Sequence, residues 1–209
     1  ADACIFKLPA SLKRSSLHKL YENLSEEDAA AVKATEQITN HDVKAVEYFI
    51  KGHLQGKDAI TVSEWVHFGL TSQDINNTAI PLLWKEAMEA VYLPALLNMV
   101  SVLKRMAKEW KSIPMLARTH GQPASPTVLG KEILVFVERL ENQVKLFSYI
   151  PYAAKFGGAT GNFNAHHVAF PKKDWIAFAN KFVDEGLGLQ RMQYTTQIEH
   201  YYNLAAHFD

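Results

Sequence analysis

A histidine at position 120 lies in the segment RTHGQPASP, between Arg118 and Pro126, where one glycine and two prolines restrict the backbone. An imidazole titrates near neutral pH, so a histidine held in a restricted segment could donate or accept a proton in catalysis. The more common role of a single loop histidine is that of a solvated side chain. The segment therefore makes His120 a candidate general acid or base.

Two further polar clusters lie where helices are predicted to begin. Asn40, His41 and Asp42 precede one apolar-periodic segment, and Thr71 and Ser72 open the segment TSQDINNT. By spacing alone, helix capping is the more common role of both clusters, because such side chains accept hydrogen bonds from first-turn N–H groups. The free N–H groups and hydroxyls of a helix start would also suit a carboxylate or phosphate.

A glycine-rich segment, GGATGN at residues 157–162, could surround an anion with N–H groups, although such segments are more often plain turns. The adjacent His166 and His167 could suggest a metal, but neighbouring positions diverge and no carboxylate stands at ligand spacing. The sequence also lacks GxxxxGK[ST], GxGxxG, HExxH and GxSxG. We therefore expect no metal and no cofactor.

The elements that must hold these clusters are predicted to be helices, because apolar residues recur three or four positions apart in every long segment. A helix from about 26 to 37 should follow an N-cap at Ser25. Thr39 or Asn40 should then cap a second helix.

Two long helices should follow. The stretch 73–111 has no glycine and predicts one helix, which Pro94 should bend. A loop over 114–126 should turn the chain into a second long helix, with coiled-coil-like spacing over 133–147. Such an antiparallel pair cannot bury both apolar faces alone, so we expect further helices or other subunits to cover them.

We therefore expect an all-α protein, with a long antiparallel helical bundle preceded by a small helical N-terminal region. Residues 1–70 would be the remainder of the N-terminal domain, and 71–209 the first part of a truncated bundle domain. The chain begins with Ala, and the helical spacing predicted for its last residues, IEHYYNLAAHFD, is still repeating at Asp209. We interpret the sequence as an internal piece of a longer protein.

The composition narrows the class of partner. Twenty-two Lys and Arg balance 22 Asp and Glu, so no net charge attracts the chain to nucleic acid or to an anionic membrane. The single cysteine, Cys4, excludes an internal disulfide. The longest apolar runs are short and interrupted by charge, and no signal-peptide pattern opens the sequence, so we expect no membrane span and a cytoplasmic location.

Taken together and in order, five segments resemble the adenylosuccinate lyase family of the fumarase and aspartase superfamily. They are TNHDVKAVEYF, TSQDINNT, RTHGQPASPT with GKE, GATGNFNAH and YTTQIE. The resemblance covers essentially the whole chain from its ADACIFKLP opening. It implies an all-α subunit whose central domain is a long bundle, in a homotetramer with active sites shared between subunits. It also implies β-elimination of fumarate from succinylated purine nucleotides, giving AMP from adenylosuccinate, and from the succinylated aminoimidazole carboxamide ribotide in the same pathway.

The resemblance assigns roles to individual residues. His120 matches the general acid that protonates the departing nitrogen. Thr71 and Ser72 match hydroxyls that hold a carboxylate of the succinyl group. The other implied substrate contacts are Asn40, His41 and Asp42 on the nucleotide side, and Gln197 in TTQIE.

Some family elements have no match in this sequence. The resemblance implies a serine base in an SSxMPxKxNP motif and an early RYG segment for the phosphate, and neither is present. We therefore expect this polypeptide alone to be inactive. The alternatives are another lyase of the superfamily, acting on argininosuccinate, aspartate or malate, or a non-catalytic helical assembly fragment. The NHDVKAVEYF and TTQIE segments favour adenylosuccinate.

Overall fold

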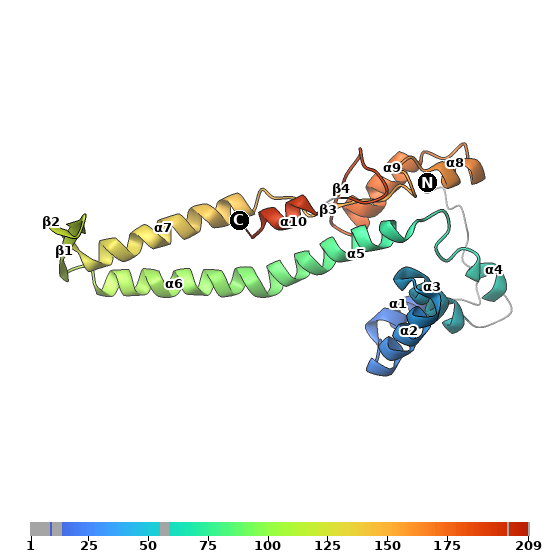
Figure 1. Cartoon of the computed structure of the whole chain (residues 1–209), viewed down its shortest axis with the longest axis horizontal. Helices are drawn as coiled ribbons and strands as arrows, with labels where there is room; N and C mark the ends of the chain where they lie inside the picture. Colours follow the sequence, from blue (N-terminus) through green and yellow to red (C-terminus); the bar gives the residue numbers. More distant parts are fainter. Residues whose placement is uncertain (1–8, 10–13, 55–58, 200, 209) are drawn as a thin grey trace. The chain divides into compact units, whose positions relative to one another are not determined.

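The computed structural model describes residue 9 and residues 14–54, 59–199 and 201–208 (Figure 1). Cys4 and most of the opening segment lie outside these residues. In chain order the elements are α1 (Arg14–Glu22), α2 (Glu26–Thr39), α3 (Asp42–His53), α4 (Ala59–Ser63), α5 (Ser72–Ala87), the π-helical η1 (Met88–Tyr92), α6 (Leu93–Glu109), β1 (Pro114–Thr119), β2 (Gln122–Val128), α7 (Leu129–Phe147), β3 (Ala153–Ala154), α8 (Asn164–Ala169), α9 (Trp175–Asn180), the π-helical η2 (Lys181–Gly186), β4 (Gln190–Arg191) and α10 (Tyr202–Ala206). Helices dominate as predicted, but two short two-stranded sheets correct the strictly all-α expectation.

The chain divides into two compact units. Unit 1 comprises Ala1–Ala79 and Ala154–Glu199, and unit 2 comprises Ile80–Ala153 and His200–Asp209. Residues 154–199 therefore pack with the N-terminal part of the chain, although more than 70 residues separate them in sequence. The division into compact units differs from the predicted domain boundary at residue 70, which stays a prediction.

The helix starts of unit 1 follow from their side chains. Ser25 caps α2 as predicted: its hydroxyl accepts from the Asp28 N–H at 3.1 Å, and its own N–H donates to the Asp28 carboxylate at 3.0 Å. The cap of α3 is His41, whose Nδ1 accepts from the Lys44 N–H at 3.2 Å. The prediction of Thr39 or Asn40 as this cap is wrong, because Asn40, at φ 52°, ends α2 in the left-handed conformation that asparagine tolerates.

The long helix runs without interruption from Ser72 to Glu109 and includes α5, η1 and α6. The sequence predicted this helix and a bend at Pro94. The structure has a π-helical turn, Met88–Tyr92, immediately before that proline. Pro94 has no N–H, and its ring crowds the carbonyl of Ala90 four residues earlier, so the wider π turn accommodates it.

The same helix changes one expectation about apolar runs. By length and composition only, this helix is long and apolar enough to cross a membrane. An 18-residue window within it has a mean hydropathy of 1.3, and 11% of that window is buried. The prediction that every apolar run is too short is therefore wrong for this segment. The core helix of a soluble protein passes the same test.

A β-hairpin joins α6 to α7 in unit 2. β1 pairs antiparallel with β2, with Thr119 opposite Gln122, so the predicted loop over 114–126 is wrong. His120 and Gly121 form the turn at φ 46° and 72°, the two left-handed residues that a type I′ hairpin requires. The prolines are tolerated because each strand of a two-stranded ribbon has a free edge.

α6 and α7 pack side by side as an antiparallel pair (Figure 1). The two helices approach each other closely at Gly130, where a Cβ atom would clash with the Ala107 carbonyl oxygen. The Gly130 N–H donates to the carbonyl of Trp110 at 3.1 Å. Several large apolar side chains of this unit are exposed to solvent, among them Leu83, Val91, Leu97, Leu134, Phe136 and Leu146. The pair therefore buries only part of its apolar surface, as predicted.

The last segment is less helical than the spacing predicted. Among the described residues of this segment only α10 is a helix, and residues 192–199 form bends and irregular backbone. The Asn77 side chain binds both the N–H and the carbonyl of Glu199, so these groups are not available for helical hydrogen bonds. The predicted helix through Ile198 is therefore wrong.

Unit 1 has an aromatic core that contains a histidine. The His166 ring lies 4.6 Å from the Trp175 ring and 5.6 Å from the Phe163 ring, and the residue is 2% exposed. A Cβ atom at Gly69 would lie 2.8 Å from its Nε2. Burial lowers the pKa of His166 below its usual value. This residue is therefore a neutral core side chain, and the described residues hold no group of three or more His, Cys, Asp or Glu that could bind a metal ion.

Candidate functional site

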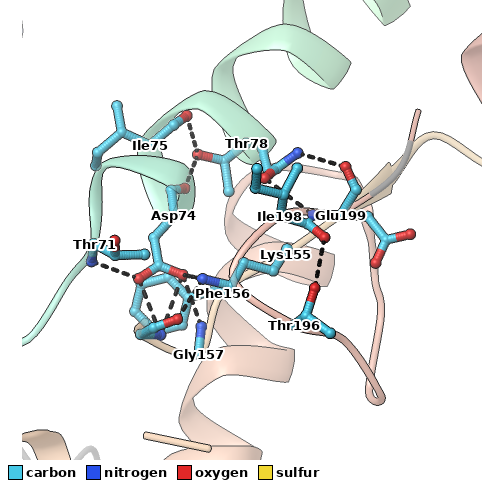
Figure 2. Close-up of polar contacts among 12 residues, drawn as sticks. Thr71, Asp74, Ile75, Thr78, Lys155, Phe156, Gly157, Thr196, Ile198 and Glu199 are labelled. Carbon is cyan, nitrogen blue, oxygen red and sulfur yellow. Dashed lines mark hydrogen bonds and ion pairs between the residues drawn. The ribbon is translucent and has the colours of Figure 1, made fainter. Parts of the chain in front are cut away.

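The carboxylate of Asp74, in the first turn of α5, is the centre of a buried network in unit 1 (Figure 2). It accepts hydrogen bonds from the N–H of Thr71 at 2.9 Å, of Gly157 at 2.9 Å and of Gly158 at 3.0 Å. The Lys155 ammonium lies 2.7 Å from the same carboxylate, and both charged side chains are 0% exposed. One side chain thus joins the TSQD segment to the GGATGN segment.

The glycine-rich segment therefore does surround an anion, and that anion belongs to the protein itself. Gly158, at φ 78°, directs its N–H to Asp74 next to that of Gly157, as in the anion-binding turns of successive N–H groups. The Lys155 ammonium also donates to the Gly158 carbonyl, which fixes it on the same turn. A carboxylate in the first turn of a helix is further stabilised by the helix dipole.

Asn77, one helical turn after Asp74, joins the TTQIE segment to α5. Its amide nitrogen donates to the Glu199 carbonyl at 3.0 Å, and its amide oxygen accepts from the Glu199 N–H at 3.2 Å. Its backbone carbonyl accepts from the Lys155 N–H at 3.2 Å. Gln197, two residues before Glu199, lies in a bend with its side chain exposed, where it could contact a ligand.

The glycine-rich and TTQIE segments also touch each other directly. At Gly161, φ is 80°, and a Cβ atom there would lie 2.8 Å from the Thr195 carbonyl oxygen. The Thr195 hydroxyl is buried and has no hydrogen-bond partner among the described residues. Only glycine allows this approach, so the GGATGN motif has a packing reason for its last glycine.

The cluster Asn40, His41 and Asp42 contacts α5 through its last member. The Asp42 carboxylate accepts from the Asn76 amide at 3.1 Å, which links the start of α3 to α5. Hydrogen bonds from the Val43 N–H and from Asn76 lower the pKa of Asp42, so it is a carboxylate at neutral pH. The cluster lines an open pocket together with residues of α2, namely Lys33, Glu36 and Gln37.

Thr71 and Ser72 lie half-buried at the start of the long helix. Half of a capping box of Thr71 and Asp74 is present, in which the Thr71 N–H donates to the Asp74 carboxylate. The Asp74 N–H donates to the backbone carbonyl of Thr71 at 3.0 Å, where a complete capping box would use the hydroxyl. The cap therefore depends on Asp74 and the backbone.

His120 belongs to unit 2, whereas the other residues predicted for the site belong to unit 1. It is exposed in the turn of the β1–β2 hairpin, in the left-handed conformation. The Arg118 guanidinium donates to the Gly121 carbonyl at 3.4 Å across this turn. The backbone restriction predicted from the sequence is thus that of a tight hairpin, and it leaves the imidazole accessible.

Two residues of this network, Lys155 and Asn77, were not predicted from the sequence. Lys155 stands between two alanines and a phenylalanine in AAKF, and such a lysine in an apolar run signals a buried, paired charge. Asn77 follows Asp74 at the helical spacing that places both on one face. Both signals were present in the sequence, but the partners of these side chains were not evident from it.

The fold of the chain is that of known lyase and cycloisomerase structures. The β-carboxy-cis,cis-muconate cycloisomerase of Acinetobacter calcoaceticus sp. ADP1 superposes with a TM-score of 0.68 at 20% identity, over 92% of this chain and 43% of that one. A fumarate lyase of Mesorhizobium sp. BNC1 gives a TM-score of 0.64 at 19% identity, over 87% and 44%. At these identities the likeness establishes the fold alone.

A family model described as lyase matches residues 9–206, and the chain belongs to this lyase family. The relatives it matches include the adenylosuccinate lyases of Dictyostelium discoideum and Escherichia coli. The first is 54% identical over 198 residues, which are 92% of this chain and 42% of the relative. The second is 42% identical over 212 residues, which are 100% of this chain and 46% of the relative. The chain thus spans less than half the length of these curated relatives, and the resemblance stated from its motifs is confirmed.

Proposed function

We propose that the protein containing this chain is an adenylosuccinate lyase. It would release fumarate from adenylosuccinate to give AMP, and from the succinylated aminoimidazole carboxamide ribotide by the same elimination. The names of the relatives support this function. The observation that carries it is the buried network of Asp74 and Asn77, which brings together three of the segments that resemble the family.

The reaction needs one proton removed and one proton added. A base takes a proton from the carbon next to a carboxylate of the succinyl group, and the electron pair left behind forms the carbon–carbon double bond of fumarate. The carbon–nitrogen bond breaks, and the departing nitrogen receives a proton from a general acid. Negative charge grows on the adjacent carboxylate during proton removal, so donors directed at it lower the barrier.

Thr71 and Ser72 are the proposed donors to this carboxylate. They are half-buried at the start of α5, where the free N–H groups and the positive end of the helix dipole favour an anion. Asn40, His41 and Asp42 would contact the nucleotide side, and their open pocket supports that role. The exposed Gln197 would contact the substrate from the TTQIE segment.

His120 is the proposed general acid. Its hairpin turn holds the backbone in one conformation while the imidazole stays accessible, which is what a proton donor to a bound substrate requires. No serine base or metal is proposed within this chain, and the polypeptide by itself would be inactive.

We further propose that the protein is a cytoplasmic homotetramer with shared active sites, whose subunits carry a long central bundle. The exposed apolar residues on α6 and α7, such as Leu97 and Phe136, support burial against further helices. The balanced charge of the chain gives no support to nucleic acid as a partner.

The proposed function is tested by supplying the whole protein with adenylosuccinate and measuring fumarate and AMP. Argininosuccinate, aspartate and malate are supplied in parallel as the substrates of other lyases. Release of fumarate from adenylosuccinate alone is the expected result. Turnover of one of the other compounds instead, or of none of them, would refute the proposal.

Thr71→Ala tests the carboxylate site within the same assay. Loss of a contact that is made in the ground state and strengthens in the transition state, as charge grows on the carboxylate, should raise KM and also lower kcat. Thr35→Ala is the matched control, because the Thr35 hydroxyl donates only to the Ala31 carbonyl within α2. The control should keep both constants, and equal behaviour of the two variants would remove Thr71 from the site.

A further inference from the structure

We infer that Asp74 and Lys155 are positioning residues, which hold the Thr71–Ser72 helix start against the glycine-rich turn so that the carboxylate site is formed before substrate binds. This inference rests on the proposed function. Neither residue is proposed to touch the substrate, because both side chains are fully buried and their hydrogen-bonding groups are taken by the protein.

The position of Thr71 depends directly on Asp74. The Thr71 N–H donates to one carboxylate oxygen at 2.9 Å, and the Asp74 N–H returns to the Thr71 carbonyl at 3.0 Å. The Gly157 N–H, 83 residues further along the chain, donates to the other oxygen at 2.9 Å. Because one carboxylate accepts from both segments, a shift of Asp74 would move the backbone of Thr71 relative to the turn.

Lys155 supplies the positive charge that compensates the buried carboxylate of Asp74. A carboxylate removed from water is costly unless a countercharge and hydrogen bonds compensate it. The Lys155 ammonium lies 2.7 Å from Asp74, and its backbone N–H donates to the Asn77 carbonyl on the same helix. The lysine is therefore attached to α5 by both its side chain and its backbone.

The charge balance also bears on substrate binding. The glycine-rich turn is already occupied by Asp74, so a substrate carboxylate must use other donors, such as the Thr71 hydroxyl. An unpaired Asp74 would repel that carboxylate, whereas the pair with Lys155 has no net charge. Removing Lys155 would therefore both loosen the turn and add negative charge beside the site.

The first test measures the positions of the two segments without using activity. In the whole protein, amide hydrogen exchange at Thr71, Gly157 and Gly158 should be slow, because all three N–H groups are donated to a buried carboxylate. Asp74→Asn and Lys155→Met should each raise these rates at least tenfold. Unchanged rates in both variants would overturn the inference.

The second test separates positioning from simple stabilisation. The double variant Asp74→Asn with Lys155→Met leaves no unpaired buried charge, so it should recover much of the thermal stability lost in either single variant. KM for adenylosuccinate should nevertheless stay at least tenfold above wild type, because the carboxylate that holds both segments is gone. Recovery of KM together with stability would overturn the inference.

The control is Asp184→Asn in the same unit, where the carboxylate accepts from the Arg191 N–H at 2.8 Å without contacting the helix start. This variant should keep the exchange rates at Thr71 and the wild-type KM. A wild-type protein without lyase activity would refute the proposed function alone, since the exchange rates decide independently whether Asp74 holds the two segments together.

Discussion

Replacing Gly161 by alanine should cost more stability than replacing Gly158, its neighbour in the same turn. The two glycines have almost the same backbone, with φ 80° and 78°, so the cost of about 1 to 2 kcal/mol for a left-handed L-residue is common to both. The comparison therefore isolates what the new methyl group touches.

The contacts of the two methyl groups differ. At Gly158 the added Cβ would lie 3.5 Å from the Gly69 carbonyl oxygen, which is ordinary van der Waals contact. At Gly161 it would lie 2.8 Å from the Thr195 carbonyl oxygen and 3.0 Å from Thr195 Cγ2, and such overpacking costs about 1 to 3 kcal/mol more. We expect losses of about 1 to 2 kcal/mol for Gly158→Ala and about 2 to 5 kcal/mol for Gly161→Ala.

Urea unfolding followed by tryptophan fluorescence measures both losses from the shift of the midpoint at constant slope. Trp175 is a suitable probe because it is 2% exposed in the core of unit 1. Equal losses in the two variants would refute the reasoning, since they would show that Thr195 does not lie against Gly161. The difference between the two losses is the decisive quantity, because the backbone strain of a left-handed alanine is common to both variants and cancels from that difference.

Three further outcomes are expected. Gly130→Ala should destabilise the protein by about 1 to 3 kcal/mol, because the added methyl group would clash with α6. Gly52 in α3 has open space around it, so Gly52→Ala should stabilise the protein by up to about 1 kcal/mol, and urea unfolding measures these opposite signs. Because burial lowers the pKa of His166, the unfolded chain binds the proton more tightly than the folded chain does, and the free energy of unfolding should fall as pH drops below about 6.5. His166→Phe should flatten this pH dependence, which is measured as denaturant midpoints from pH 8 to 5. In the whole protein, His120→Ala should lower kcat by about 10²- to 10⁴-fold, with a smaller change in KM and unchanged sedimentation; near-normal kcat would exclude it as the acid.

The helices were largely predictable because their signals are local. The cap of α2 by Ser25 and the uninterrupted run from Ser72 to Glu109 depend on residues within one or two turns of each other. Periodicity and capping report such short-range physics directly. The bend expected at Pro94 was also local, although its form as a π turn depends on how the preceding carbonyls rearrange.

The errors arose where one residue type serves two local structures. Asn40 can cap the following helix or end the preceding one, and the left-handed φ of 52° selects the second role. His120 and Gly121 look like a loop beside two prolines, yet both adopt the left-handed conformation of a hairpin turn. Histidine is a tolerated but uncommon residue at such a position, so the strand pairing was not evident from composition.

The site was predictable as a set of segments and not as a set of contacts. The TSQD, GGATGN and TTQIE segments could each be recognised, and the network of Asp74 and Asn77 does join them in unit 1. The sequence could not pair them, because a carboxylate or an amide side chain can bind any backbone N–H group, and the partners of Asp74 and Asn77 are 83 and 122 residues away. Lys155 was missed for the same reason, since its ion pair closes only when the chain is folded.

The structure also changes the choice between capping and ligand binding at Thr71. From spacing alone the two roles competed, because a single hydroxyl was expected to serve either the helix or a substrate. The Asp74 N–H, which the Thr71 hydroxyl would cap in a complete capping box, already donates to the backbone carbonyl of Thr71, and the Thr71 N–H donates to Asp74. Capping by the acid and binding by the hydroxyl are therefore compatible, and the buried Lys155 ammonium, 2.7 Å from Asp74, balances that carboxylate next to the proposed anion site.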